Sequence, residues 1–393
     1  MPAREKLWNA NYLKLWSANF MLYFSFMLLT PLLPLYLSET FGADKETIGI
    51  VLSGYTLTAL VLRALSGYLV DTFSRRAVLL TGCFVFVLFF AGYLAAGSLL
   101  LFAVVRTLHG APFGVATIAN STAAIDVLPS SRRTEGIGYY GLSNNIATAI
   151  SPTVALAIYG AMHNYRLLFV LSLLVSALGL AINWTLKLPP REPVKGKQAL
   201  SLDRFFLRKG WSQGLSMVCF GFSYGVISTY IAIYGKEELG ITGGTGLFFM
   251  LMAIGLMLSR LTGSRTLRQG RILHNAALGM LVSVGGYLMF AALHNLWGYY
   301  GAALIIGLGN GHMFPAFQTM FVNLAENNRR GTANSTLYVS WDVGVGLGTF
   351  AGGSVAEYCG FHAAFWVAWC VNAAGVLLYF AYARTRFLKD KLR

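Results

Sequence analysis

The sequence predicts an all-α integral membrane protein of twelve transmembrane helices, arranged as two six-helix pseudo-symmetric bundles. Hydrophobic residues make up 56% of the chain and charged residues only 11%, which is outside the range of soluble domains. The apolar residues fall into runs of about 20, the length that crosses a hydrocarbon core of about 30 Å. These runs are continuously apolar rather than alternating, which favours helices over barrel strands.

In chain order, the expected spans cover residues 15–37, 47–70, 76–97, 99–122, 136–160, 165–187, 211–235, 245–264, 272–293, 296–322, 331–355 and 361–384. The longest polar stretch, Lys187 to Gly210, is rich in proline and basic residues and divides the spans six plus six. We therefore expect an N-terminal bundle over 1–187, a cytoplasmic linker over 188–210 and a C-terminal bundle over 211–393.

Basic pairs indicate that the two halves are repeats. Arg132-Arg133 precedes the fifth span and Arg329-Arg330 precedes the eleventh, each after a glycine-rich helix. Parallel repeats of this size imply a substrate site between the halves near the middle of the bilayer, opened alternately to each side.

The net charge of +15 is distributed according to the positive-inside rule. Most Lys and Arg residues lie in the two tails and the even-numbered loops, whereas only Lys45, Arg166 and Lys236 fall in odd-numbered loops. This bias predicts a multi-pass protein of the inner or plasma membrane with both termini in the cytoplasm. It also accounts for the charge through the lipid bilayer, so no nucleic-acid partner is needed. No small-residue cleavage site follows the first apolar run, which indicates a retained helix.

Several classes of chemistry have no sequence signal. The four cysteines form no C-x-x-C pair, and the chain contains neither a metal-ligand cluster nor a Walker-type phosphate loop. The sequence also shows no nucleophile combined with a general base, the arrangement that would indicate an enzyme. We expect no cofactor and no metal, energy taken from a gradient if any is used, and a monomer, because one twelve-helix chain can supply a complete cavity.

The loop between the second and third spans carries the most specific motif. It reads Gly67-Tyr68-Leu69-Val70-Asp71-Thr72-Phe73-Ser74-Arg75-Arg76. This segment resembles the G-x-L-x-D-x-x-G-R-[KR] signature of the major facilitator superfamily, with Ser74 in place of the usual second glycine. The resemblance covers nearly the whole chain and implies a cytoplasmic gate formed by Gly67, Asp71, Arg75 and Arg76. Basic residues that only follow the positive-inside rule are the alternative interpretation.

The fourth span contains Arg106 and His109, followed by Gly110 and Gly114. This segment is similar to the R-x-x-x-G motif of proton-coupled family members, which implies a coupling role for Arg106 and His109. A buried arginine is costly in a membrane and normally faces a cavity or a partner. The alternatives are an arginine that reaches the interface and a histidine that packs as an ordinary hydrogen-bonding residue.

Asp342 is the one acidic residue placed deep inside a predicted span, the eleventh. A carboxylate there either pairs with a cation or takes up a proton, because desolvation disfavours its charged form. We therefore expect Asp342 to be the proton-coupling acid. The alternative is a structural ion pair or hydrogen bond that locks the eleventh span to the second.

In this family the first, fourth, seventh and tenth spans line the cavity, so their polar and aromatic residues are the substrate-site candidates. With one residue of the fifth span, they are Asn19, Tyr23, Phe26, Thr30, Arg106, Phe113, Asn144, Ser223, Tyr230, Tyr234, Asn310, His312 and Gln318. Interhelical hydrogen bonds explain some of them equally well. The mixture of aromatics, neutral polar groups and one cation suits an amphipathic or weakly anionic organic solute.

The whole pattern is similar to bacterial sugar-efflux and drug-efflux members of the drug and proton antiporter type. One departure is the fifth span, where Ser151-Pro152 stands without the usual Gly-Pro motif. The resemblance implies proton-coupled export of a small organic solute by alternating access. Uptake of a small nutrient, proton-coupled or facilitated, is the alternative, and a non-transporting membrane receptor is a third.

Overall fold

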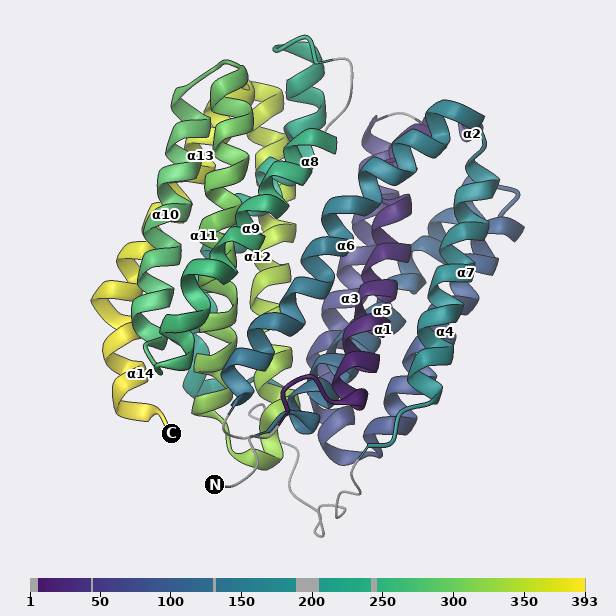
Figure 1. The fold of residues 1–393 in the computed structure, drawn as a ribbon. Helices are drawn as coiled ribbons and strands as arrows, with labels where there is room; N and C mark the ends of the chain where they lie inside the picture. Colours follow the sequence, from purple (N-terminus) through teal and green to yellow (C-terminus); the bar gives the residue numbers. More distant parts are fainter. Residues whose placement is uncertain (1–5, 44, 130–131, 189–204, 242–245, 393) are drawn as a thin grey trace. The chain divides into compact units, whose positions relative to one another are not determined.

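The computed structural model describes residues 6–43, 45–129, 132–188, 205–241 and 246–392, and every regular element in them is a helix (Figure 1). The first half contains α1 (Ala10–Leu29), α2 (Leu33–Phe41), α3 (Lys45–Thr72), α4 (Arg75–Ala95), α5 (Leu99–Val127), α6 (Arg133–Met162) and α7 (Tyr165–Trp184). The second contains η3 (Arg208–Gly210), α8 (Trp211–Glu237), α9 (Gly246–Arg268), α10 (Ile272–Ala292), α11 (Leu296–Leu324), η4 (Asn327–Arg329), α12 (Arg330–Cys359), α13 (Phe361–Leu378), the π-helical segment η5 (Tyr379–Ala383) and α14 (Arg384–Asp390).

Each of the twelve expected spans corresponds to one of these helices or to a continuous series of them. The first span is broken into α1 and α2, because Pro31 lies in the connecting turn and Pro34 lies in the first turn of α2. The last span continues from α13 through η5 into α14. The predicted all-α membrane fold is confirmed.

Nine stretches within the described residues are long and apolar enough to cross a membrane. The apolar part of α9 is shorter, Gly246–Ser259, and α11 and α12 are not among the nine. Helices α11 and α12 carry polar side chains that are buried, such as His312 and Gln318 of α11 and Ser340 of α12. These two helices are less apolar because some of their polar residues pack against protein.

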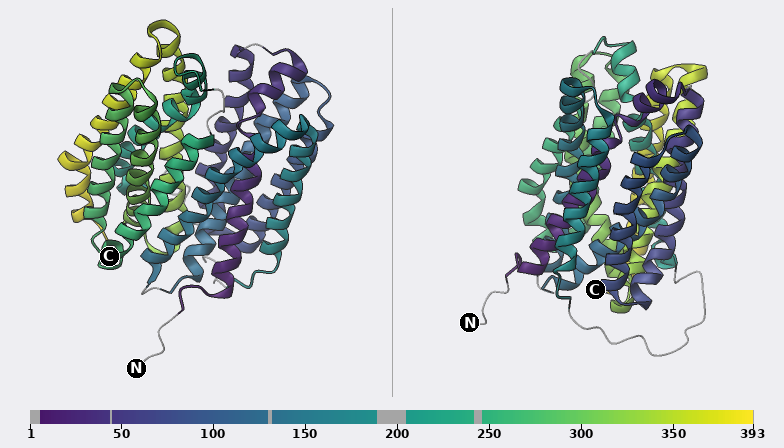
Figure 2. Two further views of the ribbon diagram at one scale, coloured as in Figure 1. Left: turned by 45° about the horizontal axis from the view of Figure 1, so that its top comes forward. Right: turned by 90° about the vertical axis from the view of Figure 1, so that its right-hand side faces the viewer.

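The chain forms two compact units, and each is a bundle of long helices (Figure 2). The first unit runs to Phe205 and also includes Asn328–Ser335, the segment in which α12 begins; the second consists of Phe206–Asn327 and Thr336 onward. Most of the expected linker, 188–210, lies outside the described residues, so its role and the expected domain boundaries stay predictions.

The same kind of helix contact is used inside both units. In the first, α5 packs against α3, and a Cβ on Gly110 would collide with the backbone oxygen of Tyr55. In the second, α11 packs against α9, and a Cβ on Gly307 would collide with the backbone oxygen of Met252. Glycine is needed at these positions because the facing backbones approach too closely for any side chain.

Candidate functional site

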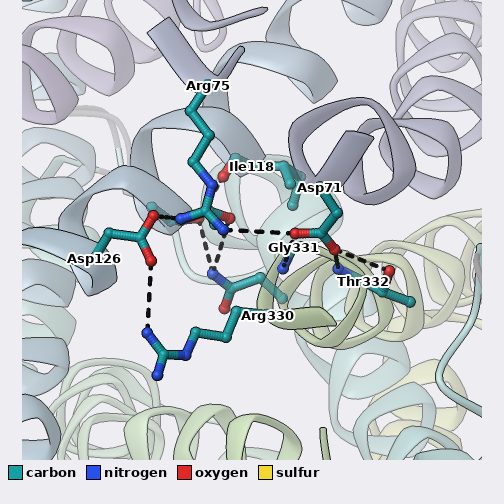
Figure 3. A network of polar contacts seen from close by, with 10 residues as sticks. Asp71, Arg75, Ile118, Asp126, Arg330, Gly331 and Thr332 are labelled. Atoms are coloured by element: carbon teal, nitrogen blue, oxygen red, sulfur yellow. Dashed lines mark hydrogen bonds and ion pairs between the residues drawn. The ribbon is translucent and has the colours of Figure 1, made fainter. Parts of the chain in front are cut away.

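Asp71 and Arg75 meet at the junction between α3 and α4 (Figure 3). Ser74 is the N-cap of α4, and its hydroxyl accepts a hydrogen bond from the Ala77 N–H at 3.5 Å. A capping serine therefore stands where the family motif has glycine, and it still begins a helix at the next residue. Arg75 Nη2 lies 3.6 Å from Asp71 Oδ1.

The Asp71 carboxylate also caps the start of α12. It accepts hydrogen bonds from the Gly331 N–H at 3.2 Å, the Thr332 N–H at 3.0 Å and the Thr332 hydroxyl at 3.2 Å (Figure 3). A carboxylate is favourable there because the free N–H groups of a helix N-terminus carry partial positive charge. Gly67 of α3 permits this approach, since a Cβ on it would lie 2.9 Å from Thr332 Cα.

Asp126, in the last turn of α5, completes the network of charges. It forms ion pairs with Arg75 and with Arg330, whose Nη1 lies 3.6 Å from Asp126 Oδ1 (Figure 3). The sequence interpretation missed this residue because it ended the fourth span at residue 122, which made Asp126 an ordinary loop acid. An acid in the final turn of a helix beside a basic loop was the available signal. We call Asp71, Arg75, Asp126, Arg330 and Thr332 the α12-start network.

Arg76 lies apart from this network. Its guanidinium donates to the backbone oxygen of Trp184, at the end of α7, across 2.9 Å on an exposed surface. Of the two arginines in the motif, only Arg75 contacts acidic side chains in the described residues.

Arg106 is buried in α5 with 4% of its surface exposed. Its guanidinium lies over the ring of Tyr55 at 4.2 Å and over the ring of Phe26 at 5.4 Å. Its Nη1 donates a long hydrogen bond, 3.4 Å, to the hydroxyl of Tyr93. Its Nε makes no hydrogen bond, and no carboxylate of the described residues pairs with it.

The energies of these contacts are too small to offset the cost of burying the Arg106 charge. A cation–π contact contributes about 0.5–2 kcal/mol, and a long hydrogen bond adds little more. Removing a guanidinium-sized ion from water costs several kcal/mol even after relaxation. Arg106 is therefore a buried cation whose charge is only partly compensated within the first unit.

His109 lies one turn further along α5 and faces α4. Its ring is fully buried among Phe86, Phe89 and Phe90, and its Nδ1 hydrogen-bonds to the Tyr93 hydroxyl at 2.9 Å. Tyr93 therefore joins His109 to Arg106. His109 therefore has one polar partner, Tyr93, and is otherwise surrounded by aromatic rings. Packing and one hydrogen bond explain much of why a histidine fits at this position.

The candidates on α1 and α6 form a polar seam with α5. Asn19 donates to the Ser143 hydroxyl at 2.8 Å, and Asn120 donates to the Tyr140 hydroxyl at 3.0 Å. Tyr23 and Phe26 pack on Phe113, with ring centroids 5.5 and 4.7 Å away from the Phe113 ring. The Thr30 hydroxyl donates to the Phe26 backbone oxygen of its own helix. The side-chain oxygen of Asn144 is buried without a hydrogen-bond partner.

The candidates of the second unit make contacts between its helices. Ser223 donates to the Ala368 oxygen at 2.7 Å, Tyr230 donates to the Thr349 oxygen at 2.7 Å, and Tyr234 packs against Phe365 with ring centroids 4.9 Å apart. Asn310 accepts from Ser283 at 3.4 Å, His312 Nδ1 lies 3.2 Å from the Asn275 side-chain oxygen, and Gln318 is buried. Their assignment to a substrate cavity stays a prediction.

Asp342 lies in α12, is half-buried and has an interaction partner. The helix around it packs closely on α8, because a Cβ on Gly221 would collide with the Trp341 oxygen and a Cβ on Gly344 with the Val218 oxygen. The acid therefore lies where two helices of the second unit are in backbone contact.

Comparison with known proteins identifies the family. The Major Facilitator Superfamily model matches residues 15–348 and 276–392, and the chain belongs to this family of membrane transporters. The staphylopine export protein of Staphylococcus aureus strain Mu50 is 22% identical over 341 residues, which cover 81% of this chain and 83% of that protein. The multidrug resistance protein MdtG of Salmonella paratyphi A is 27% identical over 192 residues, covering 45% of this chain and 46% of its own length.

Solved structures agree on the fold. The human organic anion transporter MFSD10 superposes with a TM-score of 0.78 at 16% identity, covering 94% of this chain and 98% of that chain. The match to the family model confirms the predicted family, so the chain is a multi-pass transporter for a small-molecule substrate rather than an enzyme.

Proposed function

We propose that the protein is a proton-coupled exporter of a small organic solute, working by alternating access in the cell membrane as a monomer with both termini in the cytoplasm. The observation that supports export best is the similarity to the staphylopine export protein, which extends over 81% of the chain. MdtG, whose name describes multidrug resistance, supports the same direction over 45% of the chain.

In this proposal Asp342 is the coupling acid. A coupled carrier needs a group whose protonation differs between its two open states. Asp342 is half-buried in the middle of α12, where α12 and α8 are in backbone contact, and removal from water disfavours the charged form of a carboxylate. Arg106 and His109 contribute through the buried chain of contacts that Tyr93 completes.

The α12-start network is the proposed cytoplasmic gate. Asp71 holds the first N–H groups of α12, and Arg75 holds Asp71 and Asp126 in place. Release of Gly331 and Thr332 from Asp71 would free the start of α12 from α3. These contacts are few and local, so they can be broken and remade in each transport cycle.

The test compares metabolite and dye levels inside and outside cells that express the wild type or Asp342→Asn, under a controlled pH gradient. We expect at least one compound to be enriched outside only with the wild type, and Asp342→Asn to lose concentrative transport while it retains downhill exchange. Glu357→Gln is the matched control, because Glu357 is an exposed acid on the same helix.

Three results would contradict this proposal. Enrichment inside the cells would establish an importer, and equal accumulation by the wild type and Asp342→Asn would remove Asp342 from the coupling mechanism. Loss of transport in Glu357→Gln as well would show that any change of charge on α12 damages the protein, which would leave Asp342 with no specific role.

A further inference from the structure

Arg106, Tyr55, Phe26 and Phe113 form a buried group of one cation and three aromatic rings, which we call the Arg106 cluster. Phe26 stacks on Tyr55 with ring centroids 4.8 Å apart and packs on Phe113 at 4.7 Å. The residues come from α1, α3 and α5, three helices of the first unit. Phe26 is only partly buried, so the cluster keeps one accessible edge.

Two polar groups of the cluster are buried without a hydrogen-bond partner. They are the hydroxyl of Tyr55 and the Nε of Arg106. As whole residues, Tyr55 is 5% exposed and Arg106 is 4% exposed. Buried donors are normally satisfied, so two unsatisfied donors in one cluster point to a ligand that accepts hydrogen bonds. A second buried cation, Arg63, contacts the cluster through Phe113, with its guanidinium 5.4 Å from the ring centroid.

We propose that Arg106 and Tyr55 bind a carboxylate group of the transported solute, and that Phe26 and Phe113 pack on an adjoining apolar or aromatic part of it. A planar guanidinium matches the two oxygens of a carboxylate, and a phenol adds one further donor. Arg106 supplies the guanidinium that contacts both Tyr55 and Phe26, and it matches one carboxylate group. The substrate class is therefore an amphipathic organic carboxylate. This inference rests on the proposed transport function and specifies its substrate.

Tyr93 is a positioning residue for this site. Its hydroxyl accepts from Arg106 at 3.4 Å and bonds His109 Nδ1 at 2.9 Å, so it fixes the guanidinium from the side of α4. Tyr93→Phe should weaken carboxylate binding by a few fold without removing the preference for acids over neutral compounds.

The experiment measures binding to the purified full-length protein in detergent, by the shift in its thermal midpoint. The probes are matched pairs of indole-3-acetic acid with indole-3-acetamide and 3-phenylpropionic acid with its amide. We expect the acids to stabilise the wild type and the amides to have little effect. Arg106→Gln should weaken acid binding about ten- to hundredfold, as expected for loss of a hydrogen bond to a charged group. Arg106→Lys should retain part of the preference, and Tyr55→Phe should weaken acid binding by a few fold.

Arg166→Gln is the control, because Arg166 is an exposed cation at the start of α7. It should bind the acids as the wild type does. Equal binding of acids and amides, no acid that binds the wild type, or unchanged acid binding in a folded Arg106→Gln variant would each overturn the carboxylate site. Because this assay needs no gradient and no direction of transport, it can succeed or fail independently of Asp342→Asn.

Discussion

Helices α5 and α11 occupy equivalent places in the two units but carry different chemistry. Each packs on a neighbour through a glycine in backbone contact, Gly110 in α5 and Gly307 in α11. The α5 sequence includes Arg106 and Asp126, whereas α11 contains no Asp, Glu, Lys or Arg. The two helices therefore share a way of packing on a neighbour but differ in the charged groups that they carry.

The interiors of the two units differ in the same way. Arg63, Arg106 and Glu135 are the buried charged side chains of the described residues, and all three belong to the first unit. The second unit has a large apolar cluster that includes Tyr234, Phe290 and Phe365. In the proposed mechanism, the first unit recognises charge and the second contributes Asp342 and apolar packing.

The largest expected effect tests the shared scaffold. Gly110→Val and Gly307→Val should each lower stability by about 3 kcal/mol, because the added side chain meets backbone that cannot move aside. The measurement is the thermal midpoint in detergent at a fixed scan rate, since membrane proteins unfold irreversibly. Gly285→Ala in α10 is the control, because a Cβ there meets nothing within 4 Å. A large loss for one glycine only would contradict equivalent packing.

The α12-start network should show the next largest effect. Asp126→Asn leaves Arg75 and Arg330 without their shared acid and should lower the stability of the protein by about 2 kcal/mol. Asp71→Asn weakens the cap at the start of α12 and should lower the stability by about 1–2 kcal/mol. Arg76→Gln should change the thermal midpoint little, since its contact is exposed. If Arg76→Gln matched Asp126→Asn, the network as described would be wrong.

Arg106→Met should raise the thermal midpoint of the protein without added solute. The replacement keeps the buried apolar stem and removes a charge that cation–π contacts only partly offset, a gain of about 1–2 kcal/mol. Gln318→Met in α11, a buried neutral site, serves as the comparison in the second unit and should not be stabilising. A loss of stability in Arg106→Met would indicate that the guanidinium is fully compensated.

The smallest effects should come from the loop ends of the bundles that lie away from the α12-start network. In the first unit Glu39 accepts hydrogen bonds from Tyr165 at 2.7 Å and Tyr159 at 2.8 Å, and in the second Glu238 pairs with His362 Nε2 at 2.8 Å. Because these contacts are exposed, Tyr165→Phe and His362→Phe should lower the thermal midpoint only slightly. A shift as large as that of Asp126→Asn would show that these contacts hold their bundles together.

The sequence predicted the helices well because span length and hydropathy depend on residue type alone. It missed the break between α1 and α2, although Pro31 and Pro34 marked it, since a hydropathy window averages over a turn of three residues. It also missed Asp126, whose role depends on which side of α5 faces Arg75. The rotation of a helix is set by tertiary packing, so the contacts of Arg76, His109 and Tyr55 could be found only in three dimensions.

The most direct test of the central claim follows one exported compound in everted membrane vesicles. With the vesicle interior acidified, wild-type vesicles should accumulate the compound, and a proton ionophore or Asp342→Asn should abolish accumulation while exchange continues. Accumulation that persists with the ionophore, or that is the same in Asp342→Asn vesicles, would contradict a proton-coupled exporter driven through Asp342.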